Sequence, residues 1–264
     1  MINEKNKIHK AFENKNKKAF IAFLTAGDPN KESTIRYILE MEKAGADLIE
    51  IGIPFSDPTA EGVVIQDANI RALKNGMTTD GVFEIAEEVR KVSQIPLCFM
   101  TYVNPVFHYG YEKFFTRCEE LGIDGIIIPD VPYEEKAEVE EVAAAHNVAV
   151  ISMIAPTSES RIKSIASEAQ GFIYVVSSMG VTGVRSEIKT DLETMISHIR
   201  EVTDVPCAIG FGISTPEQAA KMASISDGSI VGSAIVKIIE ANGNKADQAL
   251  SEYVSKMKAA VEQV

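Results

Sequence analysis

The chain is poor in the residues that build disulfide frameworks and metal sites. Its 264 residues include three cysteines and four histidines. Cys98, Cys118 and Cys207 are scattered without a CxxC spacing, and the histidines show no spacing typical of metal ligands. We therefore expect buried, unpaired cysteines, a reducing compartment such as the cytoplasm, and no metal ion.

Long apolar stretches and an excess of positive charge are also missing. No apolar run approaches the ~18 residues that a membrane span requires, and residues 1–18 lack the apolar core of a secretory signal. Lysine and arginine number 26 against 38 acidic residues, a net charge of −12. This balance argues against binding to nucleic acid or to an anionic membrane, so an anionic ligand would need local groups such as clustered backbone N–H groups.

Two further absences bear on the fold. The chain has no GxGxxG turn, which the rival doubly wound sheet would carry, and no Pro/Gly/Ser-rich linker. Instead, eight strand-like runs alternate with helical patterns, at residues 19–25, 46–53, 95–102, 125–129, 148–154, 172–177, 205–210 and 228–231. This alternation predicts one α/β domain over residues 1–264, folded as a (β/α)8 TIM barrel. Ile8 and Phe12 predict an extra N-terminal helix that plugs one end of the core, the alternative being an unstructured tail.

Two acids mark the second strand and the loop after it. Glu50 lies in the middle of an apolar, β-branched run at residues 48–53, which is typical of a strand covered on both faces. A carboxyl buried there should have a raised pKa and can donate a proton near neutral pH. With Glu61 on a mobile loop, it suggests an acid/base pair. The alternative is a core glutamate satisfied by a neighbour and a solvated loop acid.

Tyr174 and several glycines are further candidates. Tyr174 is expected to face the barrel interior, where its hydroxyl needs a partner such as a carboxylate; plain core filling is the alternative. Gly183, Gly212 and Gly232, with Ser233 after the last of these, can offer backbone N–H groups to a phosphate. Phosphate binds after the seventh and eighth strands of many barrels. Turn geometry alone is the alternative for the glycines.

Apolar residues near the strand ends are expected to line a ring-sized pocket: Phe23, Met100, Tyr102, Ile127, Pro129, Ile154 and Phe211. The loops at residues 55–63 and 178–187 are long for connections from strand to helix, which makes them lid candidates or, alternatively, tolerated insertions. The residues alone thus predict acid/base chemistry on a phosphate ester with a flat apolar part.

Four motifs resemble those of the tryptophan synthase alpha-subunit family. They are LTAGDP at residues 24–29, EIGIPFSDP at 50–58, MGVTG at 179–183 and GFGIS at 210–214. The second and third are specific, and the resemblance runs in order from about Phe20 to the last helix. It implies a TIM barrel that cleaves indole-3-glycerol phosphate to indole and glyceraldehyde 3-phosphate by a retro-aldol lysis.

The resemblance also implies roles for residues. Glu50 matches the catalytic acid/base, Glu61 the acid that accepts the indole N–H, and Tyr174 the tyrosine that orients it. Thr182 matches the lid threonine that meets the loop acid. Gly183, Gly212, Gly232 and Ser233 match the phosphate cradle.

The family works with a partner. The resemblance implies a beta subunit that carries pyridoxal phosphate, an alpha2beta2 heterotetramer, and no cofactor in this chain. Pro54, Asp57, Asn104 and Phe107 match the partner-facing surface.

The sequence departs from the family pattern at three positions. The family commonly has aspartate in place of Glu61, leucine in place of Thr59 and proline in place of Val63. Glutamate adds roughly 1.5 Å of reach, and a misplacement of that size can cost on the order of 10²-fold in rate. We expect activity to be retained. The alternatives are a weakly active chain that mainly binds and activates its beta partner, and a free indole producer that acts alone.

Overall fold

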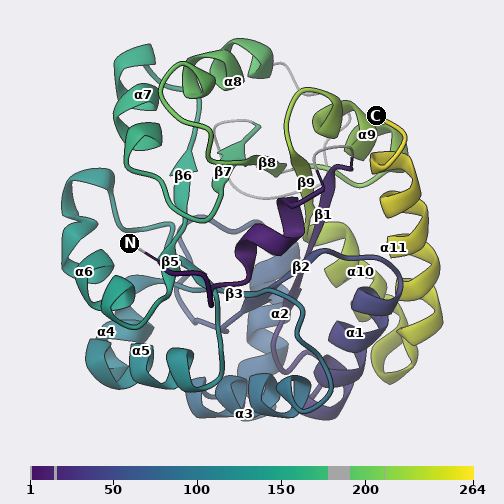
Figure 1. The fold of residues 1–264 in the computed structure, drawn as a ribbon. Coiled ribbons are helices and arrows are strands. Elements are labelled where there is room, and N and C mark those ends of the chain that lie inside the picture. Colours follow the sequence, from purple (N-terminus) through teal and green to yellow (C-terminus); the bar gives the residue numbers. More distant parts are fainter. Residues whose placement is uncertain (1, 15–16, 178–190, 211) are drawn as a thin grey trace.

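The computed structural model describes residues 2–14, 17–177, 191–210 and 212–264. Its strands are β1 (Ala19–Thr25), β2 (Leu48–Gly52), β3 (Leu97–Met100), β4 (Gly125–Ile127), β5 (Ala149–Val150), β6 (Ser152–Ile154), β7 (Ile173–Val176), β8 (Cys207–Gly210) and β9 (Gly228–Val231). All the recorded strand pairs are parallel, in the order β5-β4-β3-β2-β1-β9-β8-β7-β6. The first and last strands along the chain are therefore neighbours, as in a barrel (Figure 1).

The fifth predicted strand is divided. β5 pairs only with β4 and β6 only with β7, and Ile151 lies between them. The N–H of Ile151 donates to the carbonyl of Ile126 at 2.9 Å. The divided strand joins the two ends of the sheet order, so the nine strands make the predicted (β/α)8 barrel.

Helices surround the barrel (Figure 1). They are α1 (Lys31–Lys43), α2 (Val63–Lys74), α3 (Thr79–Arg90), α4 (Val103–Tyr109), α5 (Tyr111–Glu120), α6 (Ala137–Ala145), α7 (Glu159–Ser167), α8 (Leu192–Arg200), α9 (Pro216–Ser224), α10 (Ser233–Asn242) and α11 (Asp247–Val261). The described residues also form three short 3-10 helices: η1 (Ile8–Phe12), η2 (Tyr133–Glu135) and η3 (Gly243–Lys245). At the start of α9, Thr215 is the N-cap, Pro216 holds the first helical position, and Thr215 and Gln218 form a capping box.

Strand alternation separates two apolar clusters. The outer cluster packs the strands against the helices, and the inner cluster fills the barrel. The predicted N-terminal helix is confirmed as η1, which crosses the barrel in Figure 1. Ile8 is fully buried in the inner cluster, and the backbone N–H of Lys7 donates to Asp124 Oδ1 at 2.8 Å. η1 therefore closes the end of the barrel at which β4 begins.

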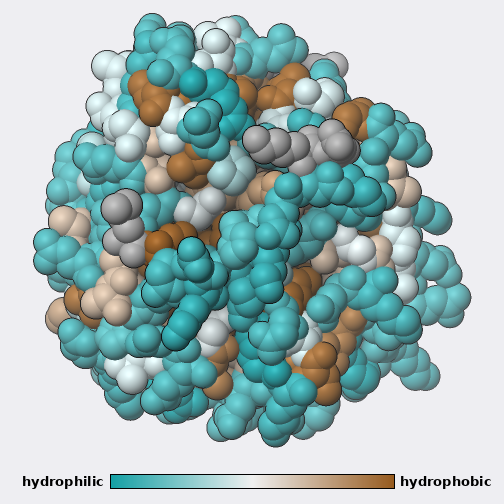
Figure 2. Space-filling model, viewed as in Figure 1, coloured by the Kyte–Doolittle hydropathy of each residue, from teal (hydrophilic) through white to brown (hydrophobic). Residues whose placement is uncertain are grey.

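Hydrophilic residues predominate on the face seen in Figure 2, and apolar residues appear there only in small separate patches. In the described part of the chain, no helix combines the length and apolar character that crossing a membrane would require.

Replacing Val63 by proline is expected to stabilise the fold by about 0.5–1 kcal/mol. Val63 is the first residue of α2 and its side chain is exposed, while Gly62 before it is extended, at φ −81° and ψ 168°. Proline suits the first helical position and an extended predecessor. Urea unfolding measures the change, with Val63→Ala as the control. A Val63→Pro variant less stable than the parent would contradict the expectation.

Candidate active site

Glu50 faces the interior of the barrel. On β2, Leu48 belongs to the inner cluster while Ile49 and Ile51 belong to the outer one, so alternation places Glu50 inward. The residue is 1% exposed, and its Oε1 has no hydrogen-bond partner among the described residues. Burial raises the pKa of Glu50 to about 8. The predicted rise in the pKa of Glu50 is confirmed. The alternative, in which a neighbouring group hydrogen-bonds the carboxyl, does not hold for Oε1.

Two residues of the inner cluster lie close enough to Glu50 for its charge to change their pKa values. Cys98 on β3 pairs in register with Glu50, and Tyr174 extends from β7 into the inner cluster. Burial raises the pKa of both side chains well above the usual range, and a negative charge on Glu50 adds to each rise. Tyr174 therefore lies where the sequence predicted it, facing inward within the field of Glu50.

Glu61 is buried, so the alternative of a solvated loop acid does not hold. It is 5% exposed, and its Oε2 accepts a hydrogen bond from Asn69 Nδ2 at 2.7 Å. Gln66 Nε2 donates to the backbone carbonyl of Glu61 at 2.6 Å. Burial raises the pKa of Glu61 to about 7, and the Asn69 hydrogen bond opposes the rise. Sequence reasoning missed Asn69, because only the folded loop brings its amide to the acid.

Four of the residues expected to line a ring pocket are buried, and the ring pocket itself stays a prediction. Phe23, Met100 and Ile127 lie in the inner cluster, and Tyr102 is buried with its hydroxyl accepting from the N–H of Ala60 at 3.0 Å. Burial first, and then the charge of Glu61, raise the pKa of Tyr102 to about 12. This phenol therefore lies near the loop acid.

The expectation for Ile154 is wrong. Ile154 packs in the outer cluster, whereas Met153 packs against the inner one. Side chains alternate along a strand, so the residue before Ile154 is the one that faces inward. Strand parity in the sequence would have found Met153. Phe211 lies outside the described residues.

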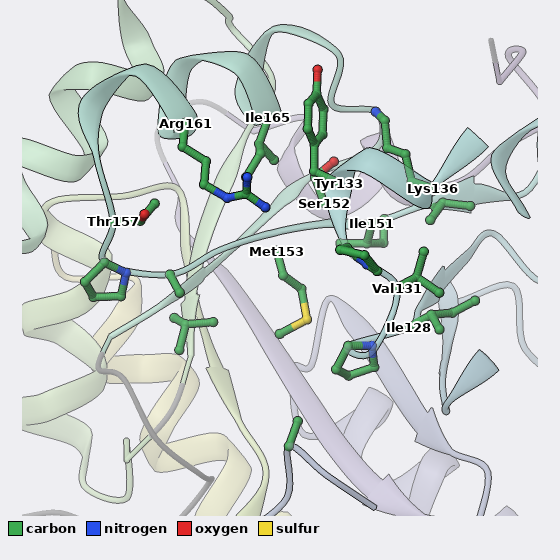
Figure 3. A pocket seen from close by; sticks show the side chains of 17 residues that line it. Ile128, Val131, Tyr133, Lys136, Ile151, Ser152, Met153, Thr157, Arg161 and Ile165 are labelled. Carbon is green, nitrogen blue, oxygen red and sulfur yellow. The ribbon is translucent and has the colours of Figure 1, made fainter. Parts of the chain in front are cut away.

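A cavity of about 510 Å³ opens beside Met153 (Figure 3). Pro129 and Met153 line it, together with Val176 at the end of β7 and Ala60, the neighbour of Glu61. Tyr133, Lys136 and Arg161 also line it. The cavity lies at the carboxyl ends of β4, β6 and β7, the end of a barrel where active sites are found.

The expected phosphate cradle is partly described. Gly212 follows β8 with φ +81°, and Gly232 and Ser233 begin α10. The N-terminus of a helix attracts anions through its free N–H groups. A Cβ on Gly232 would lie 3.2 Å from Cδ1 of Phe23, so the cradle adjoins the ring pocket. Thr182, Gly183 and the expected second lid loop lie outside the described residues.

The expected partner-facing surface needs one correction. Asp57, Asn104 and Phe107 are exposed, and Phe107 is 65% exposed on α4. Pro54, the second residue after the end of β2, is buried. Pro54 therefore cannot present its ring to a partner as expected.

One group of side chains in the described ranges has the spacing of metal ligands: Glu159, His198 and Glu201 on α7, α8 and the end of α8. Lys163 already occupies the space between the acids, with its Nζ 2.5 Å from Glu159 Oε1 and 2.6 Å from Glu201 Oε2. An ammonium ion thus neutralises the carboxylates that a metal ion would need.

The parallel barrel holds two buried carboxyls of raised pKa at its mouth, and a helix N-terminus bordered by glycine lies beside them. This is the arrangement of an acid/base enzyme. A family model described as "Tryptophan synthase alpha chain" matches residues 9–263. The chain belongs to this family.

Relatives and solved structures agree with this assignment. The tryptophan synthase alpha chain of Lactiplantibacillus plantarum is 49% identical, over 94% of each chain. A crystal structure of the Legionella pneumophila alpha chain superposes with a TM-score of 0.87 at 36% identity, covering 98% of each chain. A structure of the tryptophan synthase a2b2 complex from Pyrococcus furiosus matches with a TM-score of 0.83 at 35% identity, covering 91% of this chain and 98% of that one.

Proposed function

We propose that this chain carries out the alpha reaction of tryptophan synthase, cleaving indole-3-glycerol phosphate to indole and D-glyceraldehyde 3-phosphate, with Glu50 as the acid/base group. The observation that carries the proposal is the inward, buried carboxyl of Glu50, whose pKa of about 8 keeps it protonated at neutral pH. A carboxyl in that state can donate a proton to carbon and take one back.

The residues divide the reaction between them. Glu50 protonates indole C3, which turns the ring into an electron sink. The bond from C3 to the glycerol carbon then breaks and its electrons return to the ring. The hydroxyl on that carbon gives its proton to the Glu50 carboxylate as the carbon becomes the aldehyde, which restores protonated Glu50. Glu61, as a carboxylate, accepts the indole N–H as positive charge develops there.

Other residues hold the substrate in this proposal. Tyr174 orients Glu50, and Thr182 meets Glu61 when the loops close. Phe23, Met100, Tyr102, Ile127, Met153 and Phe211 surround the ring. Gly183, Gly212, Gly232 and Ser233 bind the phosphate.

The two acids set opposite requirements on pH. Glu61 must be ionised, which favours pH above about 7, and Glu50 must be protonated, which favours pH below about 8. We therefore expect a narrow bell-shaped dependence of kcat/KM on pH.

Replacing Asn69 by alanine is expected to shift the acidic limb of this bell to higher pH and to lower kcat/KM about three- to tenfold at pH 7. The Asn69 amide stabilises ionised Glu61, so its loss raises the pKa of Glu61. Rates of indole formation between pH 6 and 9 measure the shift. The exposed neighbour variant Asp67→Asn serves as the control, and an unmoved limb would disprove the role of Asn69.

We propose the tryptophan synthase beta subunit as the partner, in an alpha2beta2 heterotetramer in which pyridoxal phosphate belongs to the beta chain and this chain needs no cofactor. The a2b2 complex from Pyrococcus furiosus supports this assembly. Asp57, Asn104 and Phe107 are the exposed residues proposed for the contact.

Indole formation from indole-3-glycerol phosphate tests the function, measured for the chain alone and with the beta subunit. We expect turnover that rises when the partner is added. Absence of indole in both assays would refute the lyase and leave a chain that binds and activates the beta subunit. Full activity without any partner would instead indicate a free indole producer.

We propose in addition that residues 1–264 act as a single domain and that the protein works in the cytoplasm. Cys98, Cys118 and Cys207 are buried and unpaired, which fits a reducing compartment.

A further inference from the structure

The LTAGDP segment at the end of β1 carries a buried carboxylate that the proposed chemistry does not use. Asp28 is 2% exposed. Arg71 on α2 binds it with two nearly parallel contacts, Nε to Oδ1 at 2.9 Å and Nη2 to Oδ2 at 2.8 Å. This hydrogen bonding raises the pKa of Arg71. A two-pronged contact of this kind fixes the orientation of both groups, as well as their separation.

The same guanidinium reaches a third element. Nη1 of Arg71 lies 2.9 Å from Oε1 of Glu240 on α10. One planar group thus joins the loop after β1, the helix α2 and the helix α10. Asn75, the residue after α2, adds a second tie, because its Nδ2 donates to the carbonyl of Pro29 at 2.8 Å.

The two helices joined by Arg71 carry opposite ends of the site. Near its start, α2 holds the loop acid through Gln66 and Asn69, and Asn69 lies two residues before Arg71. α10 begins at Ser233 in the expected phosphate cradle. The substrate is one molecule that must contact both ends at once, so the position of α2 relative to α10 sets where Glu61 meets the ring.

We propose that Arg71 is a positioning residue for the alpha reaction, which fixes α2 against the β1 loop and α10 and thereby holds the carboxylate of Glu61 at the working distance from the phosphate site. The inference rests on the proposed function and deepens it. Arg71 does not touch the substrate in this account, and it acts through Asn69 and Glu61.

The first test is Arg71→Lys in the complex with the beta subunit. Lysine keeps the charge but cannot satisfy Asp28 and Glu240 together. We expect kcat to fall at least fivefold, because misplacement of a catalytic group lowers the rate of the chemical step. The Kd for glycerol 3-phosphate, a fragment that needs only the cradle, should stay within threefold. Lys74→Gln, at an exposed position on the same helix, is the control with unchanged kinetics.

A structural role without positioning gives a different pattern. It would lower the melting temperature and reduce fragment binding and turnover in the same proportion, and that result would overturn the proposal, as would a kcat loss smaller than fivefold. Glu240→Ala removes only the half-exposed contact to α10. This variant should remain folded, and its kcat should fall by a smaller factor than that of Arg71→Lys. An unchanged kcat would disprove the α10 connection.

A double-mutant cycle tests whether Arg71 acts through Asn69. If it does, Arg71→Lys combined with Asn69→Ala should lose no more activity than the worse single variant, whereas independent roles would multiply the two losses. Multiplied losses would overturn the proposal. Failure of the proposed function is seen separately, because the parent complex would then form no indole and no variant comparison would arise.

Discussion

Replacing Glu50 by glutamine is expected to reduce indole formation by about a thousandfold or more while the barrel stays folded. Glutamine keeps the shape of the side chain but has no proton to give at neutral pH, and a positioned acid/base group contributes ~10²–10⁴-fold. Steady-state indole release, with circular dichroism as the check on folding, measures the effect. Turnover within tenfold of the parent would remove Glu50 from the chemistry.

The same variant is expected to be more stable at neutral pH. The folded chain keeps a proton on Glu50 up to pH about 8, whereas the unfolded chain releases it near 4.5. In that window the folded state holds more protons, so the contribution of Glu50 to stability falls as the pH rises from 4.5 to 8. Glutamine does not titrate, which predicts a gain of about 3 kcal/mol at pH 7 and almost none at pH 4.

Urea unfolding at pH 4, 5.5, 7 and 8 measures this difference. Glu87→Gln, an exposed site on α3, is the matched control and should keep the pH dependence of the parent. An equal stability change for Glu50→Gln at every pH would show that Glu50 does not carry a raised pKa in the folded chain. Glu61 contributes in the same direction up to pH about 7 and remains in both proteins.

Replacing Gly210 by alanine is expected to cost about 2 kcal/mol of stability and on the order of 10²-fold in kcat. Gly210 ends β8, and a Cβ there would overlap the Tyr174 hydroxyl and lie 2.6 Å from Tyr174 Cζ. The tyrosine must therefore leave its position beside Glu50. Melting temperature and indole formation measure the two effects.

Two controls separate this displacement from general damage. Gly110→Ala introduces a side chain at φ +91° with no atom within 4 Å, so it should cost some stability and leave kcat of the isolated chain unchanged. In a Tyr174→Leu background, Gly210→Ala should cost much less stability than it does alone. Equal costs in both backgrounds would show that Tyr174 does not occupy the space above Gly210.

Much of the fold and one part of the site follow from local patterns. Alternation of apolar strands and amphipathic helices gave the barrel, because burial on one or both faces repeats with the period of each element. The raised pKa of Glu50 followed from a single acid in an apolar strand, since burial alone disfavours its charged form. Ile8 in η1 and the capping box at Thr215 are local in the same sense.

Tertiary structure decided the features that depend on residues far apart or on the direction of one side chain. Buried Glu61 accepts a hydrogen bond from Asn69, and Arg71 meets Asp28 and Glu240 across 43 and 169 residues. No local period encodes such contacts. From sequence alone a charged side chain is predicted to be exposed to solvent, because its distant partner is known only from the fold. The burial of Pro54 shows the same limit. The exchange of Ile154 for Met153 does not, because strand parity in the sequence already places Met153 on the inner face.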